Sequence, residues 1–259
     1  MTKTTLIIVS LLVGALVALF ALMLVFFPFT KDAYFTMNQG NLLKVPAGIV
    51  VIRPTHFPTS VYRRGVINTQ DKGITRLMGR NATLSELIAT AYGRQVALVV
   101  LPPNVPTNNY DFLVTVAKEP QKHLQDAIRK KLSYIAKMEL HDTDVLALKV
   151  ENPNLPGLTV SSPDEKEDGK FKDGRLYFTH MQLKVLIGGF EQILKVPVTD
   201  ETGLTNSYDF SVAWNSRVMM SLRSESTARP SIDKILSEWG LGLRPDTTSI
   251  QMLVVKKAD

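Results

Sequence analysis

The strongest hydrophobic pattern in the chain is one apolar block near its N-terminus. Every residue from Leu6 to Phe29 is apolar except Ser10, Gly14 and Pro28. A helix of about 24 residues is roughly 36 Å long, enough to cross a hydrocarbon core of about 30 Å. The block is longer than the ~7–15 apolar residues of a signal peptide and lacks a small-residue cleavage site at its end. We therefore predict an uncleaved, single-pass anchor over residues 1–29, in the membrane through residues 6–29.

The charges beside this block predict its orientation. Lys3 and the amino terminus precede it, and Lys31 on the other side is partly offset by Asp32. Positive charge favours the cytoplasmic side of a membrane. We therefore predict a cytoplasmic N-terminus and a C-terminal body outside the cytoplasm.

A stalk and a leading strand are predicted over residues 30–76. Residues 30–47 are polar and mixed, and Gly48–Pro54 is an apolar run that a proline closes. Residues 55–76 carry turn and polar residues without periodicity, which indicates a loop.

Two segments with the same order of patterns follow, over residues 77–150 and 174–259. In the first, the pattern predicts a helix after Thr83, a short strand at 96–101, a half-buried strand at 110–117 and a helix from Pro120. A hairpin around Asp142-Thr143-Asp144 is predicted to close it. Residues 151–173, rich in Pro, Gly, Ser and charge, form the predicted linker.

The second segment repeats the first in order. Leu183-x-x-Leu186-Ile187 repeats Leu84-x-x-Leu87-Ile88, and Tyr208-Asp209-Phe210 repeats Tyr110-Asp111-Phe112. Further along, Ile232 and Leu236 match Ile128 and Leu132, and Asp246-Thr247 matches Asp142-Thr143. The last strands of the two segments also match. Five matches in order indicate a duplication. Helices and strands of these lengths predict an α+β fold of two duplicated two-layer units, with mostly antiparallel or mixed sheets, behind the transmembrane helix.

Composition removes several classes of function. The 259 residues include no cysteine, which excludes disulfides, thiolate metal sites and a cysteine nucleophile. The formal charge of +6 is mild for this length and does not indicate nucleic acid, and the aromatic residues alternate into the expected cores. The four histidines have no metal-ligand spacing, and the sequence contains no phosphate loop and no Gly-x-Ser-x-Gly elbow. We therefore expect no catalytic residues, metal or cofactor.

One stretch of the second segment resembles a family signature. Thr202-Gly203-Leu204-Thr205, then Tyr208-Asp209-Phe210 and Trp214, is similar to the motif of a soil-associated bacterial family of unknown function, and Asp200 precedes it. The resemblance extends from Gly48 to Val255, although Asn206 stands where the family has a glycine. It implies a bacterial protein, and together with the predicted anchor this indicates a bacterial envelope protein with a periplasmic body.

Two weaker resemblances accompany it. Some members of that family resemble a fusion of this domain to BlaR-type sensor peptidases, whose His-Glu-x-x-His motif this chain lacks. The order of helices and strands is also similar to the short N-terminal domain of secretins and TonB-dependent transducers. The peptidase half is therefore absent from this chain, and the second likeness concerns architecture only.

The motif residues carry two alternative interpretations. Asp111 and Asp209 form either a pair of functional carboxylates or two structural acceptors of N–H groups from the preceding turns, and their occurrence in both repeats favours the structural role. Asp200-Glu201-Thr202-Gly203 forms either a site for a cation or an amine or, as we favour, a turn with Gly203 at positive φ.

The helix from Pro120 carries a candidate partner-contact face. Its basic residues form either a binding surface or a solvated helix face. Lys131 interrupts the apolar stripe where the second repeat has Ile235. The candidate contacts are Lys122, Arg129, Lys130 and Lys131.

These observations favour a non-enzymatic, membrane-anchored module that binds a protein partner, such as an accessory subunit of a membrane assembly. A sensor that binds a small ligand between the two repeats is the alternative, and a hydrolase of envelope polymer is a third hypothesis.

Overall fold

A computed structural model describes residues 32, 34–35, 38–57, 65–213 and 225–258. The predicted anchor lies outside these residues. Among the described residues, no helix combines the length and apolarity needed to cross a membrane. By their contacts, the residues group into two compact units, one ending at Leu87 and resuming over Pro106–Leu132, the other formed by Ile88–Val105 and Ser133–Asp259.

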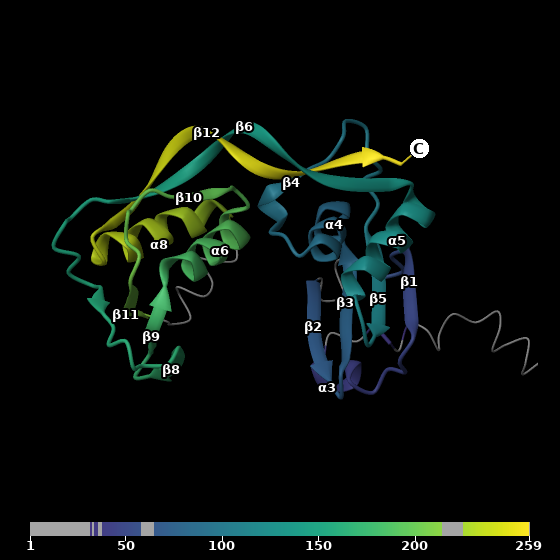
Figure 1. Cartoon of the computed structure of the whole chain (residues 1–259), viewed down its shortest axis with the longest axis horizontal. Helices are drawn as coiled ribbons and strands as arrows, with labels where there is room; N and C mark the ends of the chain where they lie inside the picture. The colour runs from purple at the N-terminus through teal and green to yellow at the C-terminus, as the bar shows by residue number, and fades with distance from the viewer. Residues whose placement is uncertain (1–31, 33, 36–37, 58–64, 214–224, 259) are drawn as a thin grey trace, which may run out of the picture. The chain divides into compact units, whose positions relative to one another are not determined.

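The first sheet is antiparallel and has the strand order β1-β5-β3-β2 (Figure 1). Its strands are β1 (Ile49–Pro54), β2 (Gly65–Asp71), β3 (Ile74–Ala82) and β5 (Tyr110–Val116). The loop predicted over 55–76 is therefore wrong, because β2 and part of β3 lie there. The hairpin turns at Lys72 and Gly73, whose φ values of 50° and 73° suit a two-residue type I′ turn.

Both faces of this first sheet are covered. Helix α5 (Pro120–Leu132) packs against β1, β5 and β3. A second cluster joins Phe35, Leu42 and Val45 to Met78 and Leu113, with Leu42 on the short helix α3 (Gln39–Leu42). The stalk prediction is wrong for these residues, because their apolar side chains are buried on the sheet. For the same reason β5 is buried on both faces, not on one as its alternation predicted.

The second sheet repeats the order of the first, as β7-β11-β9-β8 (Figure 1). Its strands are β7 (Thr159–Val160), β8 (Asp168–Lys172), β9 (Arg175–Gln182) and β11 (Ser207–Ala213). The predicted linker over 151–173 thus contains two strands. Asp173 and Gly174, with φ of 51° and 72°, form the same turn as Lys72 and Gly73. The repetition expected from the sequence is present in the strand order of the two sheets.

A third, mixed sheet has the order β10-β6-β12-β4. Its long strands β6 (Tyr134–Val150) and β12 (Leu241–Lys257) pair antiparallel along all 17 residues. β10 (Val198–Asp200) runs parallel to β6, and β4 (Val99–Val100), which follows the 3₁₀ turn η1 (Val96–Leu98), runs parallel to β12. Each long strand therefore pairs with a short strand of the other repeat. The α+β prediction with antiparallel and mixed sheets is confirmed.

The hairpin predicted at Asp142-Thr143-Asp144 does not form. These residues lie in the middle of β6, where Asp142 pairs with Ser249 and Asp144 accepts a hydrogen bond from Thr247 Oγ1 at 3.0 Å. The burial patterns of β6 and β12 agree when Tyr134 is matched to Leu241, so Asp246 is not the counterpart of Asp142. The ladder to β12 stabilises extended backbone that turn residues alone would not favour.

The helices of the second repeat lie between two sheets. α6 (Leu183–Leu194) and α8 (Glu225–Glu238) share one core with β11 and with Leu146, Leu148, Leu241 and Leu243 of the long strands. The expected two-layer unit is thus a sheet, a helix pair and a second sheet. α4 (Leu84–Tyr92) matches the helix predicted after Thr83, where Glu86 and Thr83 form a capping box.

Candidate functional site

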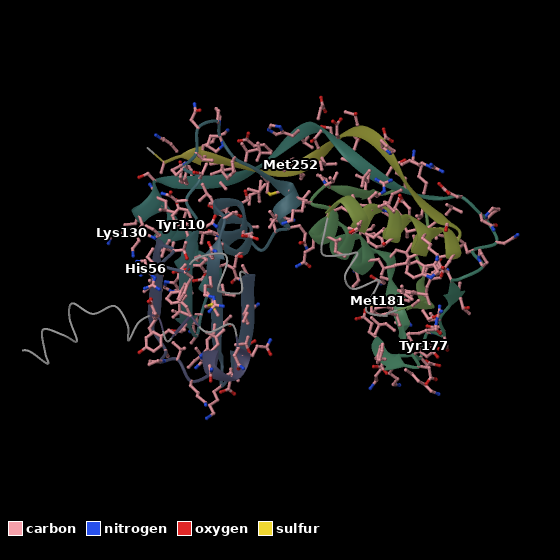
Figure 2. All side chains as sticks on the ribbon, turned by 180° about the vertical axis from the view of Figure 1, so that it is seen from behind. His56, Tyr110, Lys130, Tyr177, Met181 and Met252 are labelled. Atoms are coloured by element: carbon pink, nitrogen blue, oxygen red, sulfur yellow. The ribbon has the colours of Figure 1, made fainter. Side chains whose placement is uncertain are left out.

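Asp111 is a fully buried acceptor on the central strand β5. Its Oδ1 accepts hydrogen bonds from Thr55 Oγ1 (2.7 Å) and from the N–H of Asn81 (3.0 Å). Its Oδ2 accepts from Arg53 Nε (3.2 Å) and from the N–H of His56 (3.3 Å). These donors occupy both oxygens and tie β5 to two other segments, the end of β1 with the residues that follow it and the end of β3. Its neighbours Tyr110, labelled in Figure 2, and Phe112 are also buried.

Asp209 has the matching position on β11. Its Oδ1 accepts from Ser161 Oγ (2.5 Å) and from the N–H of His180 (2.9 Å). The donors to both aspartates come from other strands and from the residues that follow them, not from the preceding turns as the sequence suggested. Tyr208 and Phe210 beside it are buried in the core of the second repeat. The structure does not bring Asp111 and Asp209 into one site, since each is held by its own sheet.

The segment from Asp200 to Thr205 is a turn stabilised by its own side chains. Asp200 Oδ1 accepts from the N–H (3.0 Å) and the hydroxyl (2.7 Å) of Thr202, whose Oγ1 accepts from the N–H of Leu204 (3.1 Å). Gly203 has a φ of 68°, as its place in the turn predicted. Thr205 is exposed, and Trp214 lies outside the described residues. Among the residues that the structure describes, no group of His, Asp and Glu is arranged to hold a metal ion.

The four basic residues of α5 have different surroundings. Lys122 pairs with Glu119 (3.9 Å) at the surface, and Arg129 and Lys130 are exposed (Figure 2 labels Lys130). Lys131 instead donates from Nζ to the carbonyl of Ile52 on β1 at 3.2 Å. All four side chains are therefore exposed, and Lys131 differs from the other three by its hydrogen bond to the edge strand.

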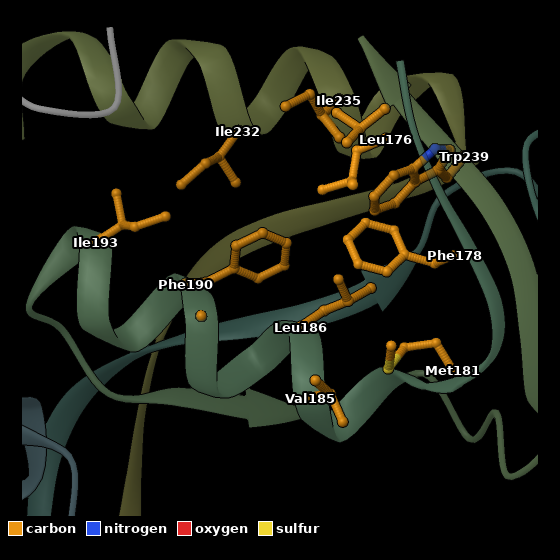
Figure 3. A pocket seen from close by; sticks show the side chains of 12 residues that line it. Leu176, Phe178, Met181, Val185, Leu186, Phe190, Ile193, Ile232, Ile235 and Trp239 are labelled. Carbon is orange, nitrogen blue, oxygen red and sulfur yellow. The ribbon is translucent and has the colours of Figure 1, made fainter. Parts of the chain in front are cut away.

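An apolar pocket opens in the second repeat, between α6, α8 and the sheet (Figure 3). Its volume is about 240 Å³. Figure 3 shows α6 side chains on one side and α8 side chains on the other, with β9 side chains between them. The lining residues are Leu176, Phe178, Met181, Val185, Leu186, Gly189, Phe190, Ile193, Val212, Ile232, Ile235 and Trp239.

Aromatic rings form one wall of this pocket. Phe178 and Trp239 line the pocket, and each packs against Phe210, at 4.9 Å and 4.8 Å between ring centroids. Trp239 donates from Nε1 to the carbonyl of Ser211 at 3.3 Å, so its polar atom is turned to the backbone. None of the described side chains that line it is titratable. The pocket can bind an apolar group, and the described part of its lining offers no acid, base or nucleophile.

The same region of the first repeat is closed. Leu77 and Leu87, the counterparts of Leu176 and Leu186, are 2% and 0% exposed, whereas Leu176 and Leu186 are only partly buried. At the position of Phe178 the first repeat has Gly79, and the ring of Phe112 occupies the space that a Cβ would need. Side chains therefore fill this space in the first repeat, and it stays open in the second repeat.

The sequence reasoning missed this pocket, because its residues follow the helical and strand periodicities of a core. One signal was available. Gly188-Gly189 lies inside a helical pattern, although glycine costs about 1 kcal/mol there relative to alanine. A Cβ on Gly189 meets no atom within 4 Å, so the missing side chain keeps the pocket open.

One ionisable side chain near the end of α6 is buried. Glu191 accepts a hydrogen bond from the N–H of Val198 at 3.1 Å. Burial raises the pKa of its carboxyl, and this hydrogen bond offsets part of the rise. Glu191 does not line the pocket and connects α6 to β10.

A comparison with known families identifies one relationship. Residues 85–258 match the model of a family described as "Protein of unknown function (DUF3738)". No curated protein and no solved structure matches the chain significantly.

Proposed function

The chain belongs to the DUF3738 family of proteins of unknown function, and we propose that it is a non-enzymatic binding module whose second repeat takes apolar side chains of a protein partner. The observation that carries this proposal is the pocket between α6 and α8, which is open where the first repeat is closed. A duplication in which one copy keeps a sealed core and the other an open one fits a division between scaffold and binding.

The size of the pocket favours side chains over a whole small molecule. A cavity of about 150 Å³ holds one benzene ring, and small-molecule sites usually span about 300–1,000 Å³. The 240 Å³ here suits one or two apolar side chains. The described residues of its wall offer no polar side chain to orient a free ligand. Apolar burial is non-directional and contributes about 25 cal/mol per Å².

Exposure at the mouth supports docking of a partner. Val185 lines the pocket and is 49% exposed, so a partner side chain that enters also covers Val185. Such an anchor in a hydrophobic pocket is the usual centre of a protein interface.

We place the module at the bacterial envelope. The apolar block Leu6–Phe29 supports a membrane anchor with a periplasmic body, and the architectural likeness to secretin and TonB-dependent domains fits an accessory subunit of a membrane assembly. The Thr202–Phe210 motif contributes turn and core contacts in this proposal, not chemistry.

Crosslinking from the mouth of the pocket tests the proposal. A photoreactive amino acid replaces Val185 in the full chain, expressed in its native membrane, and a control carries it at Phe171, which is 63% exposed and outside the pocket. We expect one protein to be crosslinked from residue 185 and not from residue 171.

A pair of glycine variants makes the test specific. Gly189→Leu puts a side chain into the pocket, whereas the Cβ of Gly188→Ala meets only Gln95 Nε2 at 3.5 Å, outside it. Crosslinking should be lost with Gly189→Leu and kept with Gly188→Ala. Equal crosslinking in both variants would overturn the proposal, as would turnover by the purified chain that depends on Asp200 or Asp209.

A small apolar ligand is the second candidate, because the pocket is concave and apolar and because the family resembles a domain fused to sensor peptidases. Trp239 lines the pocket and reports on it directly once Trp214, the other tryptophan, is replaced by Phe. A ligand-dependent change of Trp239 fluorescence that Gly189→Leu abolishes, with no crosslinked protein, would favour the sensor.

A further inference from the structure

We propose that the first compact unit holds a separate site for a small amphipathic carboxylate, with Lys131 as the partner of the carboxylate. The site is a pocket of about 390 Å³ beside the edge strand β1. This inference is independent of the proposed function, because it concerns other residues and another kind of ligand.

The walls of this second pocket are mainly apolar. Ile49, Val51 and Leu113 line it from the sheet, and Tyr34 and Phe35 line it from the segment before α3. Its volume falls within the ~300–1,000 Å³ that small-molecule sites usually span, unlike the pocket of the second repeat. The space therefore suits a compact ligand with an aromatic or aliphatic body.

Arg53, one of the two cations among the described lining residues, is already compensated. Its Nη2 pairs with Asp32 and its Nε lies 3.2 Å from Asp111 Oδ2. Its guanidinium also lies over the Phe35 ring, 4.6 Å from the centroid. These contacts make Arg53 part of the wall, so it carries no free charge for a ligand.

Lys131 is the cation that remains. Its Nζ donates to the carbonyl of Ile52, and among the described residues no carboxylate lies within 4.0 Å of it. An ammonium has three N–H donors, so two of them are left for a ligand. The contact with Ile52 holds the ammonium at the edge of β1, where an anionic group meets it and the apolar body enters the pocket.

The repeat comparison supports a specific role for this position. Ile235 occupies the equivalent position on α8 and lines the apolar pocket of the second repeat. The two copies thus place an apolar side chain in one pocket and a cation in the other. The pocket lined by Ile235 therefore suits an apolar group, and the pocket lined by Lys131 suits an apolar body with a negatively charged end.

Three ligands with one body test the charge requirement. The full chain in lipid nanodiscs is titrated calorimetrically with 2-naphthoate, 2-naphthamide and 2-naphthylmethylammonium. We expect 2-naphthoate to bind best, and Lys131→Met, which keeps an apolar stem, to weaken it roughly ten- to hundredfold, the range for a hydrogen bond to a charged group. Lys130→Met is the matched control, because Lys130 is the exposed neighbour outside the pocket, and it should leave the affinity unchanged.

Each other outcome would overturn the inference. Equal binding of 2-naphthoate to Lys131→Met and to the unmodified chain would remove Lys131 from the site. Equal affinity for 2-naphthoate and 2-naphthamide would show an apolar cavity without charge recognition. Absence of binding by all three ligands would show that the pocket takes no ligand of this class. A thermal unfolding scan of Lys131→Met confirms that the variant is folded in each case.

Discussion

His180 donates its backbone N–H to the carboxylate of Asp209 at 2.9 Å while it holds a φ of 54°. The first repeat contains the same pair, with the N–H of Asn81 on Asp111 at 3.0 Å and the same φ at Asn81. A left-handed backbone costs a non-glycine residue about 1–2 kcal/mol. The carboxylate stabilises it just where each sheet strand turns into its helix, α4 or α6.

Removing these carboxylates should therefore reduce stability in both repeats, and more in the first. Asp111→Ala breaks a buried ion pair and three further hydrogen bonds, so we expect a loss of about 3–5 kcal/mol. Asp209→Ala breaks two hydrogen bonds at a half-buried site, so we expect the free energy of unfolding to fall by about 1–3 kcal/mol. Urea unfolding measures both, with the exposed Asp126→Ala as control. Unchanged midpoints for both variants would show that the motif is not structural.

Two glycines should respond in opposite ways to the same substitution. Gly189→Ala adds a Cβ in open space inside α6, so we expect a gain of about 0.5–1 kcal/mol from helix propensity. Gly79→Ala places a Cβ in the ring of Phe112, so we expect a loss of about 1–3 kcal/mol from overpacking. Thermal unfolding compares them directly. A loss with Gly189→Ala would mean that the pocket is closed in solution.

Each long strand pairs with a short strand of the other repeat. We therefore predict that neither fragment of a chain divided between the repeats folds alone. The core of the second repeat includes Leu146 and Leu148 of β6, and within the described part of the chain β10 pairs with β6 alone. A chain split after the exposed Asn154 should reassemble when both fragments are expressed together, because the β6–β12 ladder joins them. Co-purification through a tag on one fragment measures this. Cooperative unfolding of an isolated, monomeric fragment 155–259 would contradict the prediction.

The sequence allowed prediction of those elements whose pattern and environment agree. α4, α5 and β1 follow their periodicity and caps, and their apolar faces are the buried ones. β2 was missed because it is a polar edge strand, Gly65–Asp71, whose order depends on pairing with β3. β6 was divided in two because Asp142-Thr143-Asp144 favours a turn locally, while the ladder to β12 favours extension.

The two pockets were beyond prediction for a related reason. Leu176 and Leu186 carry the same pattern as the sealed Leu77 and Leu87, and only three-dimensional packing distinguishes an open core from a closed one. Lys131 was recognised as out of place in its apolar stripe. Its contact with Ile52 depends on how α5 packs against β1. The spacing of residues along the helix does not predict this packing.

Glu191 predicts how stability changes with pH. Burial raises the pKa of its carboxyl in the folded chain above the unfolded value. The folded chain then holds the proton more tightly, so this contribution to stability is complete below the unfolded pKa and is lost as the pH rises through the folded pKa. Glu191→Gln is neutral at every pH and keeps an oxygen for the N–H of Val198.

We therefore expect Glu191→Gln to be more stable than the unmodified chain at about pH 8 and equal to it at about pH 4, where the glutamate is protonated. Urea unfolding at both pH values measures the difference. Glu165→Gln is the control, because Glu165 is exposed in a loop. A stability gain that is the same at both pH values would show that protonation of Glu191 is not its cause, and a loss at pH 8 would show that the ionised carboxylate is the form that the fold prefers.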